Sequence, residues 1–334
     1  MVIGVGHGDT SLTAMLARQS RTLRAEIDQR TSEISTGLHR DLGAALGGDF
    51  SAIAGIEQSL ARLRGYTTNT HEAALYTDIV QVALAVVNDG ATELGANILR
   101  NLGPGSETSQ TTLGIEARRI FQTTVAALNT RFANRAVFSG IEADAPPLPG
   151  PDEILAELEG AIAAATTVED LRLAVAHWFN DPGGFDAFYG GGPPRADVMI
   201  AEGEMASISV TARDPALKGT LQALSIAALL DRGALAGQPE ARANLFKSVG
   251  DDLLANGEAR SELMARVGSV QAQIVAAQAR NGAEKSGLEI TRAGLVGVDH
   301  YETAARLEDL QTRLEALFLV TSRVARLSLV DYIR

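Results

Sequence analysis

Apolar residues recur at helical spacing at both ends of the chain. Near the N-terminus the repeat advances by four or seven residues through Leu12, Leu16, Leu23, Ile27 and Ile34. This spacing predicts one helix with a continuous apolar face. The segment Ser35-Thr36-Gly37 predicts the end of that helix, because glycine readily adopts the left-handed conformation that terminates helices.

The C-terminal segment has the most regular pattern in the chain. One series recurs every seven residues, at Leu307, Leu314, Thr321 and Ser328. A second series is offset from it by three residues, at Leu310, Leu317 and Val324. Together they resemble the a and d positions of a heptad repeat, which is buried against a partner helix. The only other heptad-like stretch without a local partner is Leu12–Ile34, so we expect the two ends of the chain to pair as a coiled coil.

We also expect this helix pair to be the surface through which copies of the chain assemble. The pairing joins segments that are far apart in sequence, so loop-closure entropy opposes it early in folding. Other copies would then complete the burial of the apolar faces. The candidate assembly residues are Leu12, Leu16, Leu23, Ile27, Ile34, Leu307, Leu310, Leu314, Leu317 and Val324.

Between the two ends, the pattern predicts further long helices. Asn88-Asp89-Gly90 is expected to end the first of them, since all three residues are common in turns. The predicted helices cover residues 53–87, 91–102, 112–132, 245–279 and 288–295.

Proline marks a middle segment of different structure. Nine of the ten prolines lie between Pro146 and Pro239, and proline interrupts helices. We expect short helices at 154–162, 168–179 and 217–230, and a β-hairpin at 198–211 with a glycine-bearing turn. The expected domains are a terminal coiled coil (1–50 with 300–334), a helical rod (51–140 with 241–299) and an outer α+β domain (141–240).

Composition narrows the class of protein. The 334 residues are 46% hydrophobic but only 4% aromatic, which favours an aliphatic, helical core. The absence of cysteine excludes disulfides and thiolate chemistry. A net charge of −12 opposes nucleic acid or an anionic membrane as the main partner. The sequence contains no apolar run long enough to span a bilayer and no recognisable cleaved signal peptide.

No motif predicts catalysis, a cofactor or a metal. His71-Glu72 begins like a zinc-protease helix, but position 75, where the second histidine should stand, is leucine. The five histidines are scattered, and the glycines near the N-terminus lack the spacing of a dinucleotide loop. The aromatic residues between Trp178 and Tyr189 are interpreted as a small core. We therefore expect a protein that is not an enzyme, although an enzyme carried in the outer domain stays an alternative.

Three segments resemble the flagellar hook-associated proteins, which belong to the bacterial flagellin family. Ile34-Ser35-Thr36-Gly37 is similar to the N-terminal signature of flagellins. Residues 128–140, ending in Phe138-Ser139-Gly140, resemble an Asn-x-Arg…Phe-Ser-Gly segment of the hook-associated proteins. Residues 317–333 are similar to the C-terminal end of that family. The start, Met1-Val2-Ile3-Gly4, and the loop 42–50 differ from the usual pattern, which leaves a divergent flagellin as an alternative.

The resemblance implies a mainly α, flagellin-like fold. In such a fold long antiparallel helices carry a terminal coiled coil and a smaller inserted α+β outer domain. It also implies a structural subunit at the junction of hook and filament, outside the cell, exported without a cleaved signal. The implied partners are copies of itself, a neighbouring hook-associated protein, flagellin, the flagellar export apparatus and a chaperone, with no nucleic acid and no membrane. A soluble coiled-coil scaffold without a flagellar role is a further alternative.

Overall fold

The computed structural model describes residues 7–101 and 107–333, and this part of the chain is mainly helical. The described helices are α1 (His7–Thr36), α2 (Leu42–Ala45), α3 (Ser51–Asn101), α4 (Glu107–Leu128), α5 (Pro151–Ala161), α6 (Val168–Asn180), α7 (Phe185–Phe188), α8 (Pro215–Asp231), α9 (Pro239–Ala255), α10 (Gly257–Val296) and α11 (His300–Ile333). The described strands are β1 (Arg131–Phe132), β2 (Arg135–Ala136), β3 (Val198–Ala201) and β4 (Glu204–Ala206).

The chain divides into two compact units. Residues up to Arg62 together with those from Ala283 onward form the first, here called the terminal unit. Leu63–Gly282 form the second, here called the central unit. Helices α3 and α10 each contribute residues to both units. The expected division into coiled coil, rod and outer domain stays a prediction.

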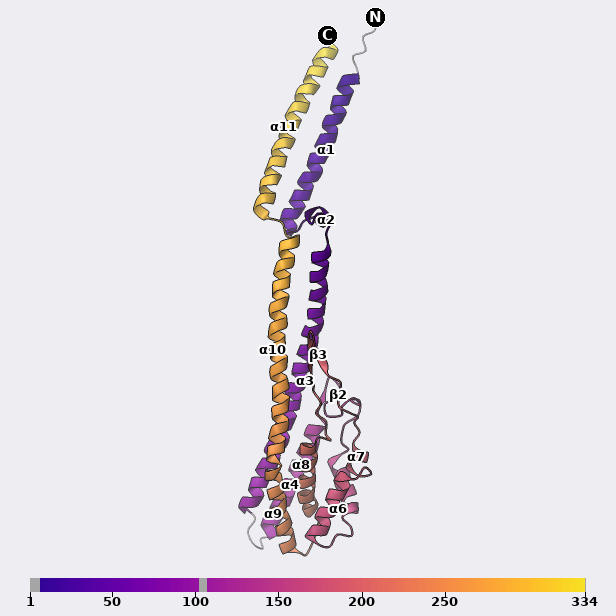
Figure 1. Ribbon diagram of the computed structural model, residues 1–334, viewed down its shortest axis with the longest axis vertical. Coiled ribbons are helices and arrows are strands. Elements are labelled where there is room, and N and C mark those ends of the chain that lie inside the picture. Colours follow the sequence, from indigo (N-terminus) through magenta and orange to yellow (C-terminus); the bar gives the residue numbers. More distant parts are fainter. Residues whose placement is uncertain (1–6, 102–106, 334) are drawn as a thin grey trace. The chain divides into compact units, whose positions relative to one another are not determined.

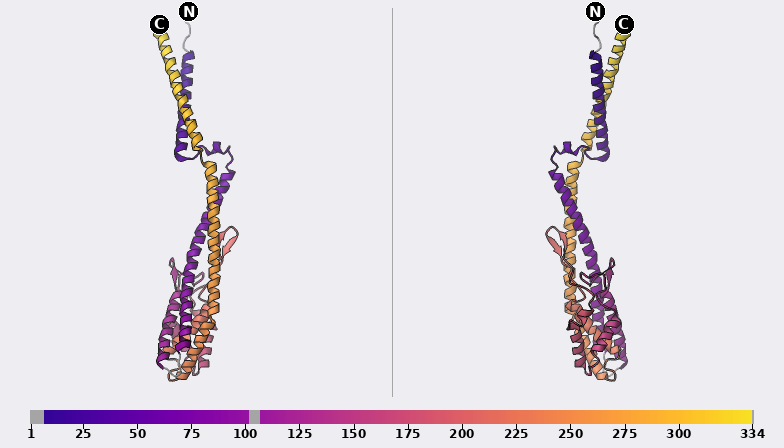
Figure 2. Two further views of the ribbon diagram at one scale, coloured as in Figure 1. Left: turned by 90° about the vertical axis from the view of Figure 1, so that its left-hand side faces the viewer. Right: turned by 90° about the vertical axis from the view of Figure 1, so that its right-hand side faces the viewer.

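In the terminal unit, α1 and α11 lie side by side and run antiparallel (Figures 1 and 2). The chain leaves α1 at Gly37, whose φ of +70° is the left-handed conformation expected from the sequence. The connection is fixed to the end of α10 by two backbone hydrogen bonds. The amide of His39 donates to the carbonyl of Val296 over 2.9 Å, and that of Val298 donates to the carbonyl of Gly37 over 3.0 Å.

The hydrophobic core lies in the central unit, and α8 is its most buried helix. α8 packs against α4, α9, α6 and α5, and twelve of its residues are buried. A helix that is apolar on nearly all faces is stable in water only when other helices cover it on several sides. The aromatic residues of α6 and α7 pack together, with Trp178 lying 5.0 Å from Phe179 and 6.2 Å from Phe185 between ring centroids. They belong to the same large core as α8, not to a small core of their own as the sequence analysis expected.

Two short hairpins belong to the central unit. β1 and β2 are antiparallel, and the residues between them, Ala133 and Asn134, have positive φ. β3 and β4 confirm the predicted hairpin, with Gly203 at φ +71° in its turn. The predicted second strand was too long, since β4 ends at Ala206 rather than at residue 211.

The prediction that a helix ends at Asn88-Asp89-Gly90 was wrong, since α3 continues to Asn101. Long-range contacts favour continuation over the local turn preference. The side-chain oxygen of Asn88 accepts a hydrogen bond from Nε of Arg260 over 3.2 Å. At Gly90 a Cβ would lie 3.1 Å from Cγ2 of Ile120, so glycine allows a close approach of α4 rather than a break.

The predicted boundaries of other helices also change. The single helix expected at 245–279 is two helices, α9 and α10, separated at Asn256. The side chain of Asn256 donates to the carbonyl of Ala216 and to the hydroxyl of Thr220, both over 3.2 Å, which ties the break to α8. α10 then runs through the glycines near its end and includes the helix expected at 288–295. α4 begins and ends earlier than the expected 112–132.

Candidate assembly surface

The heptad pattern places its best-covered side chains between α1 and α11. Leu16, Leu310 and Leu317 are 7%, 8% and 9% exposed. These three lie outside the large core of the central unit. They are therefore buried within the terminal unit, where α1 contacts α11.

Other predicted assembly residues are only half-covered. The half-covered residues are Leu23, Ile27, Ile34, Leu307, Leu314 and Val324. Leu12 is exposed. The structure thus brings the predicted residues onto one helix pair. Their role in contact between copies stays a prediction.

The sequence analysis did not include four exposed apolar residues of this pair among the candidates. On α11, Phe318, Leu319 and Val320 are exposed, Leu319 by 70%, and Met15 on α1 is also exposed. The sequence signal was the apolar run 317–320. Four consecutive apolar residues cannot all face one side of a helix, because each step turns the helix by about 100°. Arg24 of α1 partly covers this group, with its guanidinium carbon 5.5 Å from the ring centroid of Phe318.

A buried carboxylate closes the base of the helix pair. The side chain of Glu33 is 1% exposed and accepts hydrogen bonds from Gln29 (3.0 Å), Arg30 (2.5 Å) and the Arg40 amide (3.2 Å). Burial by itself raises the pKa of Glu33, but these bonds and the charge of Arg30 outweigh it, so the pKa is lower than usual. The ionised form of Glu33 therefore holds the end of α1 to the following loop.

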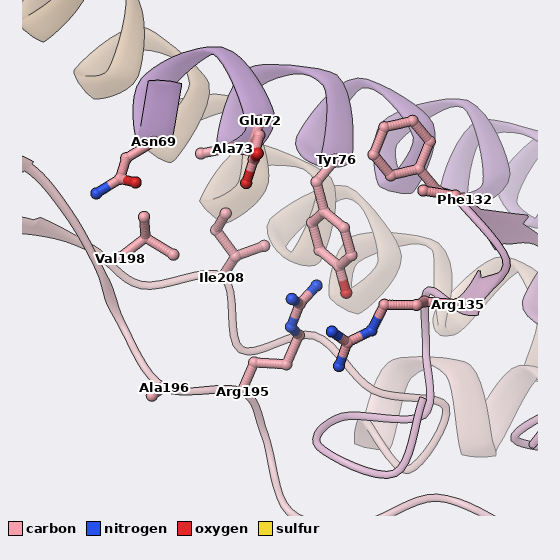
Figure 3. Close-up of a pocket in the computed structure, with 11 residues that line it drawn as sticks. Asn69, Glu72, Ala73, Tyr76, Phe132, Arg135, Arg195, Ala196, Val198 and Ile208 are labelled. Carbon is pink, nitrogen blue, oxygen red and sulfur yellow. The ribbon is translucent and has the colours of Figure 1, made fainter. Parts of the chain in front are cut away.

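The central unit contains a separate cavity of about 340 Å³, drawn in Figure 3. Residues of α3, the β1–β2 turn and the segment before β3 form its walls. Tyr76 is buried in this wall, and its hydroxyl donates to the carbonyl of Val137. Burial raises the pKa of Tyr76 despite the positive charge of Arg195 and Arg135, so the phenol stays neutral near neutral pH.

Neither a cluster that could hold a metal ion nor a helix that could cross a membrane occurs among the described residues. No group of three or more histidine, cysteine or acidic side chains that could hold a metal ion occurs among them. None of the helices in the described ranges is apolar enough over sufficient length to cross a membrane. His71 lies exposed on α3, and its neighbour Glu72 lines the cavity.

These features define a mainly α, flagellin-like fold, in which the two ends of the chain pair and a helical unit with two small hairpins lies between them in sequence. Two solved structures share it. A flagellar hook-associated protein from Vibrio parahaemolyticus aligns over 72% of this chain and 94% of its own, with a TM-score of 0.50 and 12% identity. The FlgL protein of Bacillus cereus aligns over 72% of this chain and all of its own, with a TM-score of 0.52 and 15% identity. No protein-family model and no curated protein matches the sequence.

Proposed function

We propose that the chain is a structural subunit of the bacterial flagellum and that it acts as hook-associated protein 3, the adaptor between hook and filament. The observation that carries the proposal is the α1–α11 pair, which buries few side chains and leaves an apolar group exposed on α11. The fold shared with a flagellar hook-associated protein and with FlgL supports it, as do the three sequence segments that resemble the hook-associated family.

The mechanism is assembly rather than catalysis. An isolated pair of helices that keeps Phe318, Leu319 and Val320 in water is costly, at about 25 cal/mol for each Å² of apolar surface. Neighbouring copies in a non-closing helical array would cover that surface. The half-covered residues, such as Leu23 and Leu314, would become fully buried in the same step.

The proposed partners follow from the proposed place of the subunit between hook and filament. They are copies of the chain, a neighbouring hook-associated protein and flagellin, and before assembly the flagellar export apparatus and a chaperone. The proposed location is outside the cell, after export without a cleaved signal. The chain is assigned no catalytic role.

Substitution of Leu319 by serine in the source bacterium tests the proposal. We expect loss of the subunit from the flagellum with normal folding, because position 319 is exposed within one copy. Leu173→Ser on α6 is the matched control, since Leu173 is also highly exposed but lies in the central unit. Immunogold labelling of intact flagella measures incorporation. Normal incorporation of Leu319→Ser, or equal loss in both variants, contradicts the proposed surface.

The same labelling separates the adaptor from the alternative, a divergent flagellin that forms the filament itself. An adaptor gives one band at the base of the external fibre. Labelling along the whole fibre, together with growth of long filaments from the purified protein, supports the flagellin alternative.

A further inference from the structure

The cavity of the central unit combines an apolar wall with two positive charges. Ala73, Phe132, Val198 and Ile208 supply apolar surface, and Arg135 and Arg195 also line it. In Figure 3 the guanidinium groups of both arginines lie beside the hydroxyl of Tyr76. The volume of about 340 Å³ falls in the range of small-molecule sites.

Neither arginine has a carboxylate partner within the described part of the chain. Other arginines of the central unit do, as in the 2.8 Å ion pairs of Arg118 with Asp231 and of Arg213 with Asp186. Two guanidinium groups that lie close together without a direct ion pair repel each other. An anion between them would remove that repulsion and accept charge-assisted hydrogen bonds from both.

The structure holds the side chain of Arg195 against the ring of Tyr76. The guanidinium carbon of Arg195 lies 4.8 Å from the ring centroid of Tyr76, a cation–π contact. The Tyr76 hydroxyl is already bonded to the carbonyl of Val137, so it fixes the ring rather than serving a ligand. Arg135 follows a tight turn in which Ala133 has φ +48°. Positive φ at both central residues is the usual geometry of a two-residue hairpin turn, and it places Arg135 at the start of β2.

One carboxylate, Glu72, also lines the cavity. In Figure 3 it comes from α3, beside Ala73, whereas the guanidinium groups of the two arginines lie near the hydroxyl end of Tyr76. The side chain of Asn69 is occupied by a 2.9 Å hydrogen bond to the carbonyl of Met199. The cavity therefore has a cationic end, an apolar wall, and one acidic group that would oppose an anion.

We propose that this cavity binds a small organic anion, a carboxylate carried on an apolar body, with the carboxylate against Arg135 and Arg195. The apolar body would lie on Phe132, Val198 and Ile208. The chain as a whole carries a net charge of −12 and repels anions, so binding requires this local pair of cations. The inference does not depend on the proposed flagellar function, because the assembly surface lies in the other unit.

Calorimetric titration of the full chain with hexanoate tests the site, with acetate and hexanamide as probes of charge alone and of apolar body alone. We expect hexanoate to bind at least about tenfold more tightly than either, since both halves of the cavity contribute. Arg195→Gln and Arg135→Gln should each weaken hexanoate binding about tenfold. Glu72→Gln should strengthen it, because one repulsive charge is removed.

Arg119→Gln is the matched control, since it removes an exposed positive charge of the same unit outside the cavity. It should leave hexanoate binding unchanged. Arg135 is exposed, so its variant stays informative even if Arg195→Gln fails to fold, which circular dichroism detects. The proposal is overturned if hexanoate does not bind in the millimolar range, if acetate binds as well as hexanoate, or if Arg119→Gln weakens binding as much as Arg135→Gln.

Discussion

The central and terminal units are both helical, but they bury their apolar residues to different degrees. In the central unit a large cluster that includes Phe121, Phe138 and Leu224 is completely enclosed. In the terminal unit the α1–α11 pair encloses only a few leucines and leaves Leu319 in water. Two paired helices can bury only the side chains that face each other, whereas α8 packs against neighbouring helices on several sides.

This difference shows how one chain can combine a self-sufficient unit with a unit suited to assembly. Stability follows the apolar area removed from water, so the central unit should unfold cooperatively and late. The terminal helices should open locally at a lower free energy. Trp178 is the single tryptophan and lies in the central unit, so its fluorescence reports that unit alone.

The largest effect is expected from Phe121→Ala. Phe121 is fully buried on α4, and its truncation should lower the free energy of unfolding of the central unit by about 3–5 kcal/mol through lost burial and a residual cavity. Urea unfolding followed by Trp178 fluorescence measures the loss. If Phe121→Ala lowers the free energy of unfolding no more than the replacement of an exposed leucine does, the two units do not differ in how much they depend on buried side chains.

A buried cation gives the next largest effect. Arg260 is 2% exposed, and it donates hydrogen bonds to Asn88 (3.2 Å), Thr220 (3.4 Å) and the carbonyl of Leu253 (3.0 Å). Burial lowers the pKa of this guanidinium. Arg260→Ala should cost about 2–4 kcal/mol, because it leaves these buried groups without partners and opens a cavity.

Arg260→Met is the matched variant, since methionine fills much of the same volume without a charge. It should cost about 1–2 kcal/mol less than Arg260→Ala in the same urea titration. Equal costs for the two variants would show that the hydrogen bonds alone, and not the filled volume, join α3, α8 and α10 at this point.

A smaller effect is expected in the terminal unit. Leu317→Ala should reduce helical circular dichroism and cost about 1–2 kcal/mol locally, because its neighbours can partly close the gap. The urea midpoint of Trp178 fluorescence should not move. A shift of that midpoint as large as the one caused by Phe121→Ala would show that the units unfold together.

The smallest effect is a dependence on pH. The pKa of Glu33 is lower in the folded chain than its ordinary value of 4.5, so its ionised form stabilises the fold. That contribution is complete above pH 4.5 and is lost as the pH falls through the lower, folded-state pKa. Helical circular dichroism of the wild type and of Glu33→Gln, compared at neutral and acidic pH, measures it. We expect a smaller acid-induced loss in Glu33→Gln, and identical profiles would exclude the role of Glu33.

Much of the fold follows from local pattern alone. The helical period predicted α1, α11 and the helices α5, α6 and α8, and the glycine-bearing turn predicted the β3–β4 hairpin. The unpartnered heptads at the two ends predicted that those ends meet, as α1 and α11 do. These features depend on residue spacing and turn chemistry, which a sequence shows directly.

Only the tertiary structure decided the rest. In the sequence, Asn88 and Gly90 indicate the end of a helix, but in the fold Arg260 contacts Asn88 and Ile120 lies close to Gly90, and α3 continues. The chain breaks at Asn256 because the side chain of this residue bonds to the neighbouring α8. Arg135 and Arg195 are 60 residues apart in the chain and share a cavity only after folding. The spacing of residues sets which face of a helix is apolar. Which parts of that face stay in water depends on the neighbours that the folded chain supplies, and sequence spacing does not reveal them.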